Sequence, residues 1–454
     1  MNCNYTALRA DIRRTLKIAL PLMGAQLLSM GTGLVDALVA GRIGAEELAA
    51  GGLGGAAWFF CALFCIGLMA GLSPTLSKLI GAGRRAYVGT VFRQGLLLAT
   101  SVGIASLAVA LLLAFGADWL NITPTLTPLF RSYLYAAAPS LPFFAIVMAC
   151  RNVYEATGIT RPVVVVQLLG LCINTIGNLG FGLGKFGLPA FGLPGIGWTT
   201  TLVNLCMAIT LLLLLRGPRF KRFNLFERID WPDWSILSPM LTLSVPILLA
   251  LMFEAGLFTA TALQMGMLGT LEAGAHYIAI NITGFCYMLP LGLSFALTAR
   301  IARVYGREAH TALPLRVYTG LLLTLASALL TATFLLLLRE PITALYTADR
   351  EIRDFAAYLI LFAVVFQLSD GAQATLIGML RGLQDTRVPM LINAFSYWVV
   401  AFGLGYYLAH HRDWGAAGLW TGLIIGLTLA AALLWVRLRW QLNQQLQSRA
   451  AAAI

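Results

Sequence analysis

Apolar stretches of about 20 residues recur along the whole chain, and they limit its fold more than any other feature. A helix of that length crosses the roughly 30 Å hydrocarbon layer of a bilayer and satisfies its own backbone hydrogen bonds there. Hydrophobic residues make up 59% of the 454 residues and charged residues only 11%, which excludes an ordinary soluble domain. The sequence therefore predicts an all-α, multi-pass membrane protein.

Twelve membrane-spanning helices are predicted along the chain. The first follows a basic N-terminus but is too long for a secretory signal, so we expect an uncleaved helix. The cores of the predicted spans are residues 18–40, 50–76, 94–116, 132–153, 162–184, 194–215, 238–264, 274–299, 314–338, 354–379, 388–409 and 416–436.

The basic residues are distributed unequally between the two faces of the membrane. Most of the 31 Lys and Arg residues fall in connectors on one face, which the positive-inside rule places in the cytoplasm together with both termini. We expect a bacterial-type inner (plasma) membrane. The other face receives only Arg42, Arg131, Lys185, Arg339, Arg350, Arg353 and Arg412.

The longest basic connector, residues 216–234, mixes cations with Phe and Trp side chains. Such a mixture is compatible with a nucleic-acid site, but an interfacial segment resting on anionic headgroups explains it better. We therefore expect membrane lipid, and no nucleic acid, among the partners.

The chain repeats itself at an offset of 225 residues, which is visible where Leu20-Pro21 matches Val245-Pro246. Further along, Trp198-Thr199 resembles Trp420-Thr421. The repeat predicts two six-helix lobes, residues 1–225 and 226–454. Because each lobe holds an even number of spans, both enter the membrane from the same side and form parallel repeats.

Three carboxylates, Asp36, Glu254 and Asp370, lie inside predicted spans. An ionised carboxylate in hydrocarbon costs several kcal/mol or more, so such groups normally face a cavity and mark a path for an ion or substrate. The repeat does not explain them, because Thr261 and Ser29 stand opposite Asp36 and Glu254. These three residues are the candidate cation-coupling residues.

Glu254 and Asp370 lie nearer the middle of their helices than Asp36 does, at a rise of about 1.5 Å per residue. As a pair they could exchange a proton, because burial and a neighbouring carboxylate favour the protonated form. Alternatively, Glu254 and Asp370 hold Na+. Each acid could instead cap or hydrogen-bond a broken helix.

Polar and aromatic side chains near these acids could complete a hydrated cavity. Asn174 and Asn178 are spaced i, i+4 on the fifth span, so both amides share one face and could meet the first helix. The alternative for this pair is interhelical hydrogen bonding without a role in transport. The aromatic residues could hold a flat cation through cation–π contacts. Simple packing is the alternative for them. The candidate substrate and cavity residues are Gln26, Asn174, Asn178, Tyr277, Tyr287, Met288, Phe366 and Gln367.

No cofactor is expected apart from a coupling ion. The seven cysteines form no CxxC pair and the four histidines have no convergent ligand cluster in sequence, so we infer no structural metal.

A resemblance to a known family is carried by the segments Leu20-Pro21, Val35-Asp36-Ala-Leu-Val-Ala-Gly41, Gly274-Ala-His276 with Asn281, Met288-Leu-Pro290, Asp370-Gly-Ala-Gln373 and Arg381-Gly-Leu-Gln-Asp-Thr-Arg387. In these segments the chain resembles the multidrug and toxic compound extrusion (MATE) family, in its NorM branch. The resemblance covers nearly the whole chain.

The resemblance implies a V-shaped fold of twelve helices and export of lipophilic, often cationic compounds in exchange for Na+ or H+. It maps an essential aspartate of the first helix onto Asp36, an acid of the seventh helix onto Glu254 and an acid of the tenth helix onto Asp370. Phe366 stands where Na+-coupled relatives tend to have a tyrosine, which leaves the coupling ion open.

The sequence thus predicts a monomeric multidrug efflux antiporter, not an enzyme, that works by alternating access on small lipophilic cationic drugs. A flippase for lipid-linked oligosaccharides, of a related fold, is the alternative within transport. A passive channel and an intramembrane protease are further alternatives.

Overall fold

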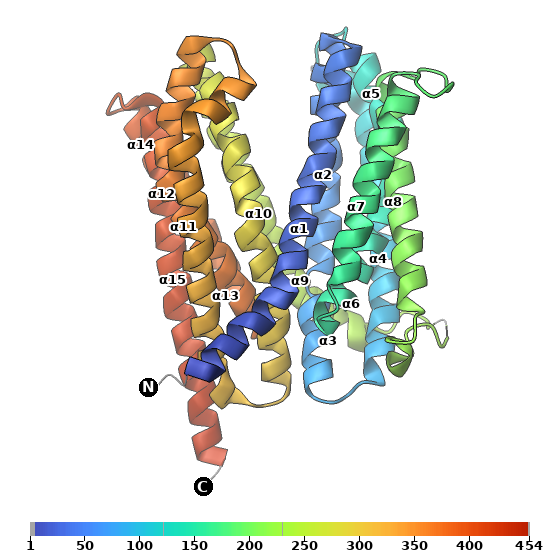
Figure 1. Cartoon of the computed structure of the whole chain (residues 1–454), viewed down its shortest axis with the longest axis vertical. Helices are drawn as coiled ribbons and strands as arrows, with labels where there is room; N and C mark the ends of the chain where they lie inside the picture. Colours follow the sequence, from blue (N-terminus) through green and yellow to red (C-terminus); the bar gives the residue numbers. More distant parts are fainter. Residues whose placement is uncertain (1–4, 121, 229, 453–454) are drawn as a thin grey trace. The chain divides into compact units, whose positions relative to one another are not determined.

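The computed structural model describes residues 5–120, 122–228 and 230–452, and within these ranges every regular element is a helix (Figure 1). The elements before the long connector are α1 (Tyr5–Ile43), α2 (Ala45–Met69), α3 (Leu72–Gly81), α4 (Tyr87–Phe115), η1 (Gly116–Leu120), α5 (Thr127–Ala137), α6 (Ser140–Thr157), α7 (Arg161–Gly177), η2 (Asn178–Gly182) and α8 (Leu193–Leu215). Those that follow are η3 (Lys221–Phe223), α9 (Trp234–Leu268), α10 (Thr270–Gly306), η4 (His310–Ala312), α11 (Leu313–Tyr346), α12 (Arg350–Gly382), α13 (Arg387–Ala394), η5 (Phe395–Phe402), α14 (Gly403–His410) and α15 (Gly415–Ala452).

The number of spans agrees with the prediction. In the described part of the chain, 11 helical segments are long and apolar enough to cross a membrane. Helices α5 and α6 are bent by 46° relative to each other, and the number of candidate spans rises to 12 if this pair is counted as one span. The pair corresponds to the predicted span 132–153. Pro139 lies at this break, where its missing N–H and its ring interrupt the helical hydrogen bonds. The all-α fold class is therefore confirmed.

The residues group into two compact units. The N-terminal unit is Gly24–Leu248, and the C-terminal unit consists of Met1–Met23 and Leu249–Ile454. The chain passes from one unit to the other inside α1 and inside α9, two residues after Pro21 and two residues after Pro246. The lobes 1–225 and 226–454 stay a prediction about the internal repeat.

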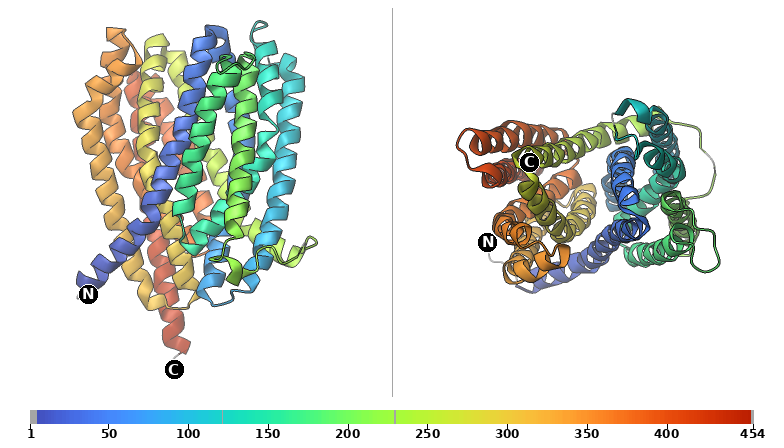
Figure 2. Two further views of the ribbon diagram at one scale, coloured as in Figure 1. Left: turned by 45° about the vertical axis from the view of Figure 1, so that its right-hand side comes forward. Right: turned by 90° about the horizontal axis from the view of Figure 1, so that it is seen from above.

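Close packing of α1 against α7 positions the first acid in the N-terminal unit. A methyl group added at Gly24 would lie 3.3 Å from Val164 of α7, and one at Gly31 would lie 3.7 Å from Leu171. On its other side α7 contacts α8, and the two helices run side by side (Figure 2). Small residues on α1 thus bring its backbone close to α7, which carries Asn174 and continues into η2 at Asn178.

Helix α12 contacts α10, α11 and α15 in the C-terminal unit. The hydroxyl of Ser294 on α10 donates to the carbonyl of Ala374 at 2.7 Å, and that of Thr298 donates to the carbonyl of Gly378 at 2.8 Å. These interhelical hydrogen bonds fix the rotation of α12 about its axis. They therefore fix the direction in which Asp370 points.

Candidate functional site

Asp36 is the centre of a hydrogen-bonded network in the N-terminal unit. Asn174 Nδ2 donates to Asp36 Oδ1 at 2.9 Å, and Asn178 Nδ2 donates to the same oxygen at 2.6 Å. Both asparagines are buried, whereas Asp36 is half-buried. The expected meeting of the fifth span with the first helix is present, and the two amides converge on one carboxylate oxygen.

The backbone around Asn178 departs from the regular α-helix. Helix α7 ends at Gly177, and residues Asn178–Gly182 continue it as the π-helix η2. Such wide turns occur frequently at functional sites because they rotate side chains away from the α-helical register. Asn178 Oδ1 is buried and has no hydrogen-bond partner within the described residues. Buried polar atoms are rarely left unsatisfied, so this oxygen is an acceptor available to a ligand.

A second group of ionisable side chains lies in the C-terminal unit. Glu254 on α9 and Asp370 on α12 are close enough for their charges to interact, and both interact with the phenol of Tyr287 on α10. Asp370 is buried and Glu254 is half-buried. The structure thus brings together the two acids that the sequence suggested as a pair.

Amide and phenol groups surround this acid pair. Gln373 Nε2 donates to the hydroxyl of Tyr397, which belongs to the π-helix η5 and interacts electrostatically with Asp370 and Glu254. Gln367 is buried, and neither of its amide atoms has a hydrogen-bond partner among the described residues. Carboxylate, amide and phenol oxygens are hard ligands, so this arrangement suits a hard cation or a proton.

The other candidate cavity residues differ in their surroundings. Tyr277 is 64% exposed, and Tyr287 and Met288 are half-buried, as is Gln26 in the N-terminal unit. Phe366 is buried in an aromatic cluster, with ring centroids 6.1 Å from Phe258 and 5.8 Å from Trp420. Their roles as substrate contacts stay predictions.

Among the described residues, no group of three or more His, Cys, Asp or Glu side chains could hold a metal ion. His276 is buried edge-on against Trp420, with ring centroids 5.8 Å apart. Of the cysteines, Cys61, Cys65, Cys150 and Cys286 are buried, and Cys3 lies outside the described residues.

Two residues of these networks, Tyr397 and Tyr133, were not predicted from the sequence. Tyr397 is one of 14 tyrosines, and no local pattern distinguishes it, since its contact with Gln373 depends on how η5 packs. Tyr133 on α5 is buried and interacts electrostatically with Asp36, again from a distant part of the chain.

Comparison with known proteins gives consistent matches over almost the whole chain. The MatE family model matches residues 21–179 and 246–407. Probable multidrug resistance protein NorM of Xanthomonas campestris pv. campestris is 35% identical over 97% of this chain and 96% of that protein, and multidrug resistance protein MdtK of Yersinia pestis is 34% identical over 96% of each. The structure of a multidrug resistance MATE family transporter in an outward-facing conformation superposes with a TM-score of 0.88 at 18% identity, over 96% of this chain and 97% of that one.

Proposed function

The chain belongs to the MatE family, and from this premise we propose that it is a multidrug efflux antiporter that exports lipophilic, mostly cationic compounds in exchange for Na+ or H+. The names of the relatives, multidrug resistance proteins NorM and MdtK, support drug export rather than enzymatic chemistry. We propose further that it works as a monomer by alternating access in a bacterial-type inner membrane, with both termini in the cytoplasm.

The observation that carries the proposal is the Asp36 network. Asn174 and Asn178 both engage Oδ1, so neither asparagine occupies Oδ2. A proton or Na+ can bind there while the two charge-assisted hydrogen bonds hold the carboxylate in place. The unpartnered Asn178 Oδ1 then supplies a second acceptor for the bound ion.

Glu254 and Asp370 form the second proposed ion site. Two carboxylates whose charges interact in a poorly hydrated interior repel each other, and one bound cation or proton relieves that repulsion. Glu254 and Asp370 are the residues that would hold Na+ as a transported ion. Tyr397, held by Gln373, borders the pair and orders its surroundings.

Coupling requires that ion and drug each weaken the binding of the other. This reciprocity is a thermodynamic necessity for binding free energies. An ion that enters from outside and neutralises a carboxylate removes the negative charge that attracts a cationic drug. The drug is thereby released as the ion is bound.

The experiment that tests this function is transport of a fluorescent lipophilic cation in proteoliposomes, with a Na+ gradient or a pH gradient imposed separately. We expect flux driven by one of the two gradients and lost in Asp36→Asn. Asp118→Asn, at an exposed carboxylate of η1, is the matched control and should transport normally. Flux indifferent to both gradients would indicate a channel, and transport of a lipid-linked oligosaccharide instead of the cation would indicate a flippase.

The second site is tested in the same vesicles with Glu254→Gln and Asp370→Asn. Each variant should transport with altered ion dependence. If both keep the ion dependence of the wild type, the pair has a structural role only.

A further inference from the structure

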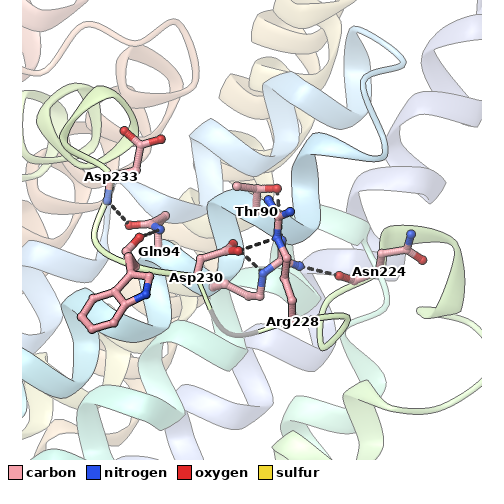
Figure 3. A network of polar contacts seen from close by, with 8 residues as sticks. Thr90, Gln94, Asn224, Arg228, Asp230 and Asp233 are labelled. Atoms are coloured by element: carbon pink, nitrogen blue, oxygen red, sulfur yellow. Dashed lines mark hydrogen bonds and ion pairs between the residues drawn. The ribbon is translucent and has the colours of Figure 1, made fainter.

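The connector between α8 and α9 is held against α4 by a network of polar contacts (Figure 3). Arg93 of α4 donates from Nε to Asp230 Oδ2 at 2.7 Å and from Nη1 to the carbonyl of Asn224 at 2.7 Å. Arg228 Nε donates to the other oxygen of Asp230 at 2.6 Å. Asp230 is thus held between two guanidinium groups.

Gln94, the next residue of α4, forms hydrogen bonds with the connector backbone at a second point. Its Nε2 donates to the carbonyl of Trp231 at 2.7 Å, and its Oε1 accepts from the backbone N–H of Asp233 at 2.9 Å (Figure 3). Both atoms of one buried amide therefore hold the backbone on the two sides of Pro232. This clamp fixes the segment that carries Trp231.

The apolar residues of the first half of the connector point into the protein. Phe220, Phe223 and Leu225 are buried, and the Phe220 ring lies edge-on to Tyr154 of α6 with centroids 5.2 Å apart. The cations of the same half are exposed. Among the described residues, none of these exposed cations forms an ion pair; they are Arg216, Arg219, Lys221 and Arg222.

Two tryptophan side chains of this segment are exposed, although Gln94 holds the backbone beside them by two hydrogen bonds. Trp231 is 90% exposed and Trp234 is 69% exposed. The connector joins two candidate membrane spans, α8 and α9, and lies at one end of these helices (Figure 2). We therefore expect it at a surface of the bilayer. Tryptophan prefers this depth, since its ring is apolar and its N–H needs a polar partner.

We propose that the exposed cations and tryptophans of this connector form a preorganised binding surface for anionic phospholipid headgroups. Arg219, Lys221 and Arg222 contact the lipid phosphates, and Trp231 and Trp234 insert at headgroup level. The charges are complementary, because exposed cations lie beside a surface that carries anionic lipid. The clamp by Gln94 and the pairs of Asp230 order the surface before lipid binds, which reduces the entropy lost on binding.

The test compares lipid association with the full-length protein in nanodiscs, using spin-labelled phosphatidylglycerol and spin-labelled phosphatidylcholine. The triple variant Arg219→Gln/Lys221→Gln/Arg222→Gln should lose preference for the anionic lipid by about fivefold for each cation at low ionic strength. The matched control is Lys185→Gln/Arg350→Gln/Arg412→Gln, which removes the same residue types from exposed positions elsewhere and should keep the preference. Equal preference in both variants would overturn the proposal.

The tryptophans are tested by quenching with lipids brominated near the headgroup. Trp231→Ser should lower the quenched fraction of fluorescence more than Trp119→Ser, whose side chain is 82% exposed in η1. Cation flux in vesicles of phosphatidylcholine alone should stay unchanged in Trp231→Ser, which shows that the variant is folded. A folded Trp231→Ser protein with wild-type quenching would contradict insertion.

The role of the clamp is tested by Gln94→Leu, which removes both hydrogen bonds at similar volume. A nitroxide placed at position 231 should become more mobile, and the preference for phosphatidylglycerol should fall severalfold. An unchanged spectrum and an unchanged lipid preference would show that Gln94 is not a positioning residue.

A labelled RNA oligonucleotide is the competing ligand, tested with the protein in phosphatidylcholine nanodiscs. If the RNA binds, and the triple variant abolishes this binding, the surface belongs to nucleic acid and the lipid assignment is overturned.

Discussion

Asp11 of α1 and Arg300 of α10 form a buried ion pair across 289 residues of sequence. Arg300 Nη2 donates to Asp11 Oδ1 at 2.6 Å and Nη1 donates to Oδ2 at 3.3 Å, while Arg316 of α11 also donates to Oδ1. Asp11 is 2% exposed. One carboxylate therefore ties the first turns of α1 to two helices of the C-terminal unit.

Removal of this carboxylate should destabilise the protein strongly. Asp11→Asn leaves two guanidinium groups without their counter-charge, and breaking a buried pair costs about 3–5 kcal/mol. We expect a clear drop in the thermal unfolding temperature of the purified protein. Asp354→Asn, which removes the exposed partner of Arg350, should change stability by less than about 1 kcal/mol. Equal unfolding temperatures for the two variants would contradict the assigned role of Asp11.

The two asparagines of the N-terminal unit should contribute unequally to ion coupling. Asn178 makes the shorter hydrogen bond to Asp36, 2.6 Å against 2.9 Å for Asn174. Hydrogen bonds to charged groups contribute about 1.5–3 kcal/mol, so Asn178→Ala should shift the ion concentration for half-maximal flux by roughly tenfold or more, and Asn174→Ala by less. Asn204→Ala is the control, because Asn204 donates to a carbonyl of its own helix. The reverse order of effects would show that bond length does not decide the contributions.

Tyr397 should influence the ion dependence of the C-terminal site. Tyr397→Phe removes the acceptor of Gln373 and leaves a buried amide unsatisfied beside Asp370, which costs about 1–3 kcal/mol. The expected result is a changed ion dependence of drug flux. Tyr154→Phe is the matched control, since its hydroxyl donates to the carbonyl of Leu211 in the other unit. A change common to both variants would point to general loss of stability.

The helix prolines at the two crossings between units should act as hinges. Pro21 and Pro246 each precede a crossing by two residues, and both crossings stand in the same register of the repeat. An alanine restores the missing helical hydrogen bond and stiffens the helix. Pro246→Ala should lower the turnover rate by roughly tenfold while drug binding at equilibrium stays the same. Pro239→Ala in the same helix lies away from the crossing and should transport normally; slow transport in that control would argue against a specific hinge.

The connector should lose stability in acid. The hydrogen bond from Arg93, and then that from Arg228, hold the pKa of Asp230 below its ordinary range despite partial burial. Since the folded-state pKa is the lower one, the stabilisation is fully present above the ordinary aspartate value of about 3.9 and is lost as the pH falls below it. Thermal unfolding between pH 7 and pH 3 should therefore show a steeper loss in the wild type than in Asp230→Asn. Parallel curves would show that the pair does not contribute.

Much of the architecture follows from local sequence. Each span is encoded by its own run of apolar residues, because a helix in lipid satisfies its backbone without help from distant residues. The internal repeat follows from a comparison of the two halves of the sequence. The three acids stand out because each lies inside an apolar span. The spacing of Asn174 and Asn178 even indicated which face of the fifth span would meet the first helix.

Which side chains meet was decided by tertiary structure. Asp11 looks like one acid in a basic N-terminal segment, and only the packing of α10 and α11 places Arg300 and Arg316 against it. Tyr397 reaches Gln373 because η5 packs against α15, which in turn contacts α12. The sequence by itself determined the all-α class, the approximate number of membrane spans and the positions of the carboxylates along them. The rotation of each helix, and hence the partners of each carboxylate, depends on contacts between residues far apart in the chain, which no local pattern records.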